Sequence, residues 1–198
     1  MIHIETIDRE HRQDLLLPNE PFALTGRMAL SYTDGQWRYE VRPFPPEQVG
    51  EMCFPDEGYD FDAMEDSVFL GAYDGEKCVG LAVLQPGCFK YMYLYDLKVC
   101  RAYRGRKIAS LLMDEARKLA LEKGFRGLYT QGQDNNAGAW PACSTCITAF
   151  GSAGWIPRST RAPGRKERRI FSFILTVDFR TARVRRRMDH GACQQLYA

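Results

Sequence analysis

The chain has 198 residues, of which 45% are hydrophobic, and it carries 27 Lys and Arg against 25 Asp and Glu. This length allows one domain with a sizeable core and would cramp two. No apolar run approaches the roughly 20 residues of a membrane span, and the charged first residues lack the apolar core of a signal peptide, so we expect a cytoplasmic protein without a membrane partner. The seven irregularly spaced cysteines do not suggest a disulfide framework, and the three histidines have no partners spaced for a metal site.

The first half of the chain is predicted to contain one helix and two hairpins. Apolar residues within 1–17 are spaced for a short helix with one face inward. Two hairpins follow, because an Asp-Gly pair lies between two alternating runs in two places. The first spans residues 22–41 with its turn at Thr33–Gly35, and the second spans residues 67–85 with its turn at Asp74–Gly75.

The centre of the chain predicts a strand, a turn and a helix in succession. Residues 91–99 alternate as a long strand, with one face made of Tyr91, Tyr93, Tyr95, Leu97 and Val99. A turn at 103–109 opens a helix over residues 110–123, and another strand is expected over 125–130. Backbone N–H groups and the positive end of the helix dipole then point at one place, which suits a phosphate or pyrophosphate. Hairpins followed by a strand–helix–strand unit indicate a mixed α/β (α+β) sheet.

This order of elements resembles the GNAT superfamily of acetyl-CoA-dependent N-acetyltransferases. The turn of that family has the pattern R/Q-x-x-G-x-G/A, and here it is Arg104-Gly-Arg-Lys-Ile-Ala109, with Lys107 in place of the usual glycine. The resemblance implies a central, mostly antiparallel sheet flanked by helices, and acetyl-CoA as cosubstrate. It implies that acetyl-CoA is held by Arg104, Gly105, Arg106, Lys107, Ile108 and Ala109, by the strand backbone at Leu97 and Val99, and by Asn135 or Asn136. A turn or helix cap is the alternative role for the two asparagines.

More of the chain, about residues 20–136, is similar to one branch, the streptothricin acetyltransferases. The similarity rests on PF-x-L-x-G-R at 21–27, on Gln36-Trp37, and on Gln-Asp-Asn-Asn at 133–136. It implies acetyl transfer to an amino group on the β-lysine part of streptothricin, which is an antibiotic-resistance activity. An aminoglycoside, a polyamine or a protein terminus is the alternative acceptor. A non-catalytic acyl-CoA-binding module is the alternative from a different class.

The segment 47–66 is the most acidic part of the chain, with eight carboxylates and no Lys or Arg. Such a field attracts a cationic small molecule and repels anions. A solvated acidic loop has the same composition and is the alternative. The residues that we expect to line the substrate are Trp37, Asp60, Asp62, Tyr93 and Tyr95, although tyrosines on a strand also serve as packing residues.

Asp96 is the predicted catalytic residue. An amine arrives mostly protonated, so a carboxylate beside it promotes transfer, and Asp96 lies mid-strand among tyrosines next to the turn. A hydrogen-bonded core carboxylate is the alternative. The departing thiolate also needs a proton, which the family takes from a tyrosine in the following helix. This chain has no tyrosine between Tyr129 and Tyr197.

Residues 137–198 depart from the family. Residues 1–136, the predicted acetyl-CoA-binding core, carry 16 Lys and Arg against 22 Asp and Glu, whereas the basic tail over 137–198 carries 11 against 3. We hypothesise that most of residues 139–198 are an out-of-frame translation, which predicts a poorly stable protein with weak or no activity. The Arg-rich end would then be an accident of codons, so we expect no nucleic-acid partner. The coding DNA tests this: codons that cannot spell the family helix in the alternate frame would contradict it.

Overall fold

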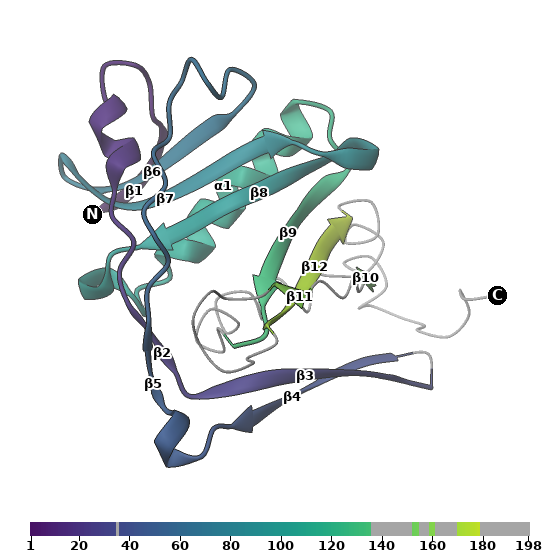
Figure 1. Ribbon diagram of the computed structural model, residues 1–198. Helices are drawn as coiled ribbons and strands as arrows, with labels where there is room; N and C mark the ends of the chain where they lie inside the picture. Colours follow the sequence, from purple (N-terminus) through teal and green to yellow (C-terminus); the bar gives the residue numbers. More distant parts are fainter. Residues whose placement is uncertain (35, 136–151, 155–158, 161–169, 179–198) are drawn as a thin grey trace.

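The computed structural model describes residues 1–34, 36–135, 152–154, 159–160 and 170–178 (Figure 1). Its main sheet has the order β1-β6-β7-β8-β9-β12-β10, with β11 paired to β12. These strands are β1 (Ile2–Thr6), β6 (Val68–Asp74), β7 (Lys77–Pro86), β8 (Tyr91–Val99), β9 (Gly127–Gln133), β10 (Ser152–Gly154), β11 (Ser159–Thr160) and β12 (Ile170–Asp178). Among the described strands β8 and β9 pair in parallel, and the other neighbours pair antiparallel. The predicted mixed, mostly antiparallel sheet is therefore confirmed.

Two short ribbons lie outside this sheet. One joins β2 (Phe22–Leu24) to β5 (Gly50–Met52), and the other joins β3 (Gly26–Thr33) to β4 (Gln36–Pro43). The second is the predicted Asp-Gly hairpin, and Asp34 has the positive φ of 55° that a two-residue hairpin turn requires. Single 3₁₀ turns connect the larger elements: η1 (Arg12–Leu16), η2 (Pro46–Gln48), η3 (Cys88–Lys90) and η4 (Arg101–Tyr103).

The helix α1 (Ile108–Glu122) covers one face of the sheet, across β6, β7 and β8 (Figure 1). Its buried side chains recur three or four residues apart and join the larger apolar core: Ile108, Leu112, Met113, Ala116 and Ala120. Gly124, at a φ of 79°, follows the helix end, as predicted. No helix in the described part of the chain is long and apolar enough to cross a membrane.

The prediction of a helix over residues 1–17 is wrong. Residues 2–6 form the edge strand β1, which pairs with β6, and η1 is only one 3₁₀ turn. Asp8 explains the break, because its Oδ1 accepts the backbone N–H groups of Glu10 and His11, each at 3.0 Å. This local turn replaces helical hydrogen bonds at that point. The segment instead covers the second face of the sheet, where Ile7 and Leu15 pack in a smaller core with Tyr59, Phe69, Leu81 and Val83.

A β-bulge in β8 decides which side chains reach which face. Leu94 is opposite Leu84 and Asp96 is opposite Val83, so Tyr95 is an extra residue without a partner in β7. The bulge reverses the alternation, so Leu97 and Val99 pack on the α1 side of the sheet. Their predicted position on the tyrosine face is therefore wrong. The same shift brings Asp96 onto the face that carries Tyr95.

The thiol of Cys78 is predicted to be unreactive in the folded protein. Cys78 is 8% exposed at the start of β7, and burial raises the pKa of its thiol to about 11. The nucleophilic thiolate is then scarce at neutral pH. Brief treatment with iodoacetamide at pH 8, followed by peptide mass spectrometry, should leave Cys78 unmodified until denaturant is added, whereas exposed Cys53 should be alkylated. Alkylation of Cys78 as fast as Cys53 would contradict its placement.

Candidate active site

The strands β8 and β9 separate at the centre of the sheet. Their pairing covers Tyr91–Leu94 and Gly127–Thr130, and the Thr130 hydroxyl donates to the carbonyl of Leu94 at 2.9 Å, at the last paired position. Beyond Thr130, β9 stays paired with β12, while β8 continues to Val99. The two strands therefore diverge (Figure 1). The edge of residues 95–99 that would face β9 therefore lies outside the sheet ladder. Leu97 and Val99 lie on this edge.

The turn between β8 and α1 presents backbone N–H groups that have no hydrogen-bond partner among the described residues. Gly105 and Lys107 have φ angles of 78° and 62°, and Lys107 caps α1 without a side-chain hydrogen bond. The N–H groups at the start of a helix have no intrahelical partner, and the helix dipole is positive there. A Cβ added at Gly105 would meet no described atom within 4 Å. The residues present thus fit an anionic phosphate group.

The side chain of Arg104 stabilises this turn from within. Its guanidinium donates to the carbonyls of Val99 at 3.1 Å, Pro21 at 2.7 Å and Glu20 at 3.2 Å. The guanidinium of Arg106 instead lies over the exposed side of the turn, 4.9 Å from the ring centre of Tyr103. Arg104 thus ties residues 20–21 to the end of β8, and its contact with a cofactor stays a prediction.

Asp96 lies in a small polar group on the tyrosine face. Its Oδ2 accepts the Tyr59 hydroxyl at 2.7 Å and lies 3.5 Å from the Nζ of Lys98. The Lys98 ammonium is also 5.1 Å from the ring centre of Tyr59, and its side chain is only 9% exposed. Burial and the bond to Asp96 raise the pKa of Tyr59, so its hydroxyl stays protonated and donating. Both contacts use one carboxylate oxygen of Asp96, and the side chain keeps 24% of its surface exposed.

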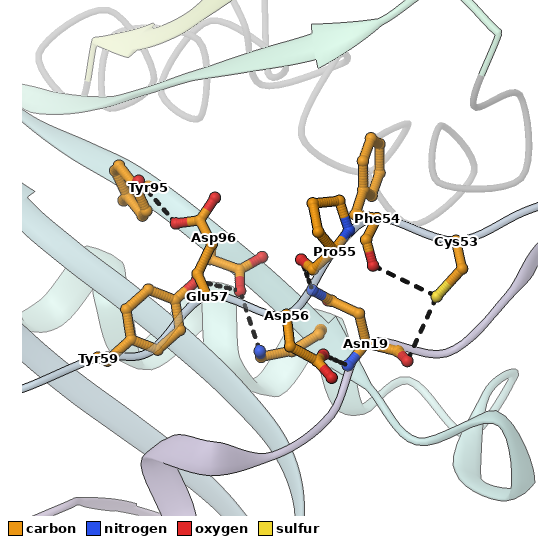
Figure 2. A network of polar contacts seen from close by, with 10 residues as sticks. Asn19, Cys53, Phe54, Pro55, Asp56, Glu57, Tyr59, Tyr95 and Asp96 are labelled. Carbon is orange, nitrogen blue, oxygen red and sulfur yellow. Dashed lines mark hydrogen bonds and ion pairs between the residues drawn. The ribbon is translucent and has the colours of Figure 1, made fainter. Parts of the chain in front are cut away.

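Four tyrosines in ring contact, called the tyrosine wall below, adjoin Asp96: Tyr59, Tyr93, Tyr95 and Tyr129. The hydroxyl of Tyr95 donates to Oε2 of Glu57 at 2.7 Å, and this bond raises the pKa of Tyr95 to about 12 (Figure 2). The Tyr95 ring meets the rings of Tyr59 and Tyr93 edge-on, at centroid distances of 6.2 and 5.8 Å. Tyr93 in turn stacks on Tyr129 at 4.8 Å. The structure therefore brings Tyr93, Tyr95 and Asp96 together, as the substrate and catalytic predictions require.

The other predicted substrate residues are Asp60, Asp62 and Trp37. The Asp62 carboxylate pairs with Arg9 at 2.7 Å, and Asp60 accepts the backbone N–H of Asp62 at 2.7 Å. Trp37 is on β4 opposite Tyr32, and its side chain lies outside the described residues. Substrate contact by these three residues stays a prediction.

Three residues of the site were not predicted: Glu57, Tyr59 and Lys98. Tyr59 and Asp96 are 37 positions apart, and Tyr95 and Glu57 are 38 apart. Lys98 lies on the face of Tyr95 only because of the bulge, which moves Asp96 and Lys98 there together. The eight carboxylates of segment 47–66 indicated the region, but no local pattern distinguished Glu57 from the others.

The end of β9 docks against the β3–β4 ribbon. Asp134, only 1% exposed, forms an ion pair with Arg27, whose Nε lies 3.0 Å from its Oδ2, and the backbone carbonyl of Asp134 accepts the N–H of Met28 at 2.7 Å. Asn135 is 7% exposed, its Nδ2 is 3.8 Å from Sδ of Met52, and its Oδ1 has no hydrogen-bond partner among the described residues. Asn136 lies outside them. The two asparagines stay predicted cofactor residues, whereas Asp134 has a structural partner.

A sequence model of the acetyltransferase (GNAT) family matches residues 33–144, which is more than half of the chain. The chain belongs to this family. Streptothricin acetyltransferase A of Bacillus subtilis is 28% identical over 130 residues, which is 64% of this chain and 73% of that protein. This relationship agrees with the branch that the sequence motifs indicated. The family membership makes the protein an acetyltransferase, as predicted.

Two solved structures share the fold of this GNAT acetyltransferase. One, from Bacillus anthracis str. Ames, is described as a streptothricin acetyltransferase in complex with acetyl coenzyme A. It has a TM-score of 0.73 and 17% identity, covering 90% of this chain and 100% of that chain. A nourseothricin acetyltransferase has a TM-score of 0.67 and 17% identity, covering 89% and 98%. At these identities the structures establish the fold alone, and they confirm the GNAT-like architecture.

Lys107 is expected to strain the turn in which the family usually has glycine. A side chain at a φ of 62° costs about 1 kcal/mol, so Lys107→Gly should raise the free energy of unfolding by up to about 1 kcal/mol. Lys107→Ala removes the same charge but keeps the Cβ, and it should be neutral within about 0.5 kcal/mol. Urea denaturation measures both. A Gly variant less stable than the Ala variant would contradict strain at this position.

Proposed function

We propose that this GNAT acetyltransferase transfers the acetyl group of acetyl-CoA to an amino group of a small cationic amine. The observation that carries the proposal is the carboxylate of Asp96, fixed by Tyr59 and Lys98 just beyond the point where β8 and β9 separate. One of its oxygens is occupied by these partners. Its other carboxylate oxygen can accept a hydrogen bond from a substrate ammonium.

The turn before α1 fits the pyrophosphate of acetyl-CoA. Its positive-φ residues, its uncapped helix start and the exposed Arg106 and Lys107 provide N–H donors and positive charge. We propose that the open edge of β8 at Leu97 and Val99 pairs with the pantetheine arm, and that Asn135 hydrogen-bonds its amides. Among the described residues, no three His, Cys, Asp or Glu lie together as a metal site.

The proposed reaction is direct transfer. Asp96 takes a proton from the substrate ammonium, and the neutral nitrogen attacks the thioester carbonyl carbon. A C–N bond forms as the C–S bond breaks, and the proton that this nitrogen loses on becoming an amide is taken up by the coenzyme A thiolate. Tyr59 and Lys98 hold Asp96 in place while it accepts the proton. Their fixed donors also limit the reorganisation that the transfer requires.

We propose streptothricin, at the β-lysine amino group, as the acceptor, with antibiotic resistance in the cytoplasm as the biological result. Support comes from the similarity to streptothricin acetyltransferase A and from the carboxylates of Asp96 and Glu57 beside the tyrosine wall. A cationic acceptor is favoured by such surroundings.

Thiol release tests the proposal. The full chain is mixed with acetyl-CoA and streptothricin, free coenzyme A is followed with a thiol reagent, and the antibiotic is examined by mass spectrometry. We expect coenzyme A and acetylated streptothricin in equal amounts. Acetyl-CoA binding without thiol release would favour a non-catalytic acyl-CoA-binding module, and release only with another amine would change the acceptor.

A further inference from the structure

Glu57 differs from three other carboxylates in having no ion pair among the described residues. Asp62 pairs with Arg9, Glu51 pairs with Arg101, and Asp96 pairs with Lys98. For Glu57 the recorded partner is the neutral hydroxyl of Tyr95, and no cation lies within ion-pair distance of it in the described part of the chain. Its negative charge is therefore uncompensated beside an aromatic ring that is 40% exposed.

The position of Glu57 is fixed from two sides. From β8 it accepts the Tyr95 hydroxyl, and Tyr95 is the bulge residue. From the opposite side, Asn19 holds the two preceding residues: its side chain donates to the carbonyl of Pro55 at 2.9 Å, and its backbone N–H donates to Oδ1 of Asp56 at 2.6 Å (Figure 2). Glu57 therefore belongs to a loop that hydrogen bonds from Asn19 and Tyr95 hold beside the tyrosine wall.

This loop is also connected to the cofactor turn. Asn19 precedes Glu20 and Pro21, whose carbonyls accept from Arg104. The contacts therefore form a closed path from Tyr95 along β8 to the turn, through residues 19–21, and back through Glu57. Hydrogen bonds and covalent chain alternate along this path, which restrains the position of Glu57 relative to β8. Both carboxylates act electrostatically on both Tyr59 and Tyr95, which places them within one group.

We propose that Glu57 binds a second ammonium group of the substrate, so that the site prefers diamines to monoamines. The inference rests on the proposed function, in which Asp96 receives the reacting amine. An ammonium at Glu57 would gain a charge-assisted hydrogen bond beside the partly exposed Tyr95. Glu57 is then a specificity residue. The acidic segment 47–66 contributes this direct contact with the substrate, in addition to its general electrostatic attraction for cations.

Two amines of equal chain length test the proposal: 1,4-diaminobutane and butylamine, which has a hydrogen in place of the second amino group. In Glu57→Gln, the amide oxygen still accepts from Tyr95 while the charge is lost. The ratio of kcat/KM for the diamine to that for butylamine should fall about tenfold, because a charge-assisted contact is lost at a partly exposed site. The diamine has two equivalent amines, which doubles its kcat/KM in the wild type and in the variant alike. This factor cancels when the ratios of the two proteins are compared.

Glu65→Gln is the matched control, since it makes the same change at an exposed position of the same acidic segment. It should leave the ratio within about twofold, because long-range attraction is screened by salt. Equal effects of the two variants would show that only the general field matters and would overturn the proposal. An equal loss for both amines in Glu57→Gln would overturn it as well.

Calorimetric binding of the two amines to the same variants separates this inference from the proposed function. If Glu57 binds the second ammonium, Glu57→Gln weakens binding of 1,4-diaminobutane about tenfold and leaves butylamine unchanged, whether or not turnover occurs. Absence of thiol release with every amine would overturn the proposed function alone. Diamine binding that is unchanged in Glu57→Gln would overturn the role of Glu57 alone.

Discussion

Replacing Asp96 with asparagine is expected to lower kcat/KM for acetyl transfer by about 10²- to 10³-fold, since a positioned general base contributes on this scale. Asparagine has nearly the same shape and can still accept the Tyr59 hydroxyl that Asp96 accepts at 2.7 Å. It cannot take up a proton from the substrate ammonium. Steady-state thiol release measures the loss.

Acetyl-CoA binding and an exposed aspartate provide the controls for this prediction. The dissociation constant of acetyl-CoA should stay within about twofold in Asp96→Asn, because Asp96 lies on the tyrosine face and the cofactor is proposed to bind at the turn. Asp114→Asn, on the exposed side of α1, should have the wild-type rate. A wild-type rate in Asp96→Asn would show that Asp96 is a structural carboxylate, which is the alternative role left open by the sequence.

Replacing Arg27 with methionine is expected to lower the free energy of unfolding by about 3 kcal/mol, because it leaves a buried carboxylate without its partner. The Asp134 side chain is only 2% exposed and lies 3.0 Å from Nε of Arg27. The pair joins the β3–β4 ribbon to the end of β9, so its loss should also loosen the ribbon. Urea denaturation followed by fluorescence measures the change.

An exposed ion pair and a double variant distinguish burial from charge pairing as such. Arg9→Met breaks the pair with Asp62, and because the two side chains of that pair are 69% and 77% exposed, the variant should leave the free energy of unfolding nearly unchanged. Arg27→Met combined with Asp134→Leu removes both charges and should recover much of the stability lost in the single variant. Similar losses in Arg9→Met and Arg27→Met would contradict the account of Asp134.

Elements with strong local patterns were predictable from the sequence. The strand 91–99 alternates along its whole length, and the helix has apolar residues at helical spacing followed by Gly124. Both hairpins have Asp-Gly pairs at their turns. These features depend on residues close in sequence, so neither sheet order nor packing was needed to recognise them.

Features set by distant contacts were not predictable. Residues 2–6 become a strand because β6 offers an edge to pair with. That edge is 64 positions away for Thr6, which is opposite Leu70, and 72 positions away for Ile2, which is opposite Asp74. The bulge at Tyr95 follows from its register with β7, and it alone moves Leu97 and Val99 to the α1 face. Tyr59, which holds Asp96, comes from a loop that the sequence marked only as acidic.

The C-terminal hypothesis concerns residues that lie mostly outside the described part of the chain. Within it, residues 170–178 form β12 and pair along the whole of β9, from Gln133 opposite Ser172 to Gly127 opposite Asp178. This part of the sheet edge is therefore covered. The out-of-frame origin of the tail and the weak activity that it predicts stay predictions, which the coding DNA and the measured turnover address separately.

Asp96 is proposed to serve an acetyl-CoA-dependent transfer to a cationic amine. The most direct measurement compares thiol release by the wild-type chain and by Asp96→Asn, with acetyl-CoA and streptothricin present and the antibiotic analysed by mass spectrometry. We expect acetylated streptothricin with the wild type, and an amount at least about 100-fold smaller with the variant. Equal product from both proteins, or none from the wild type with any amine while acetyl-CoA still binds, would contradict it.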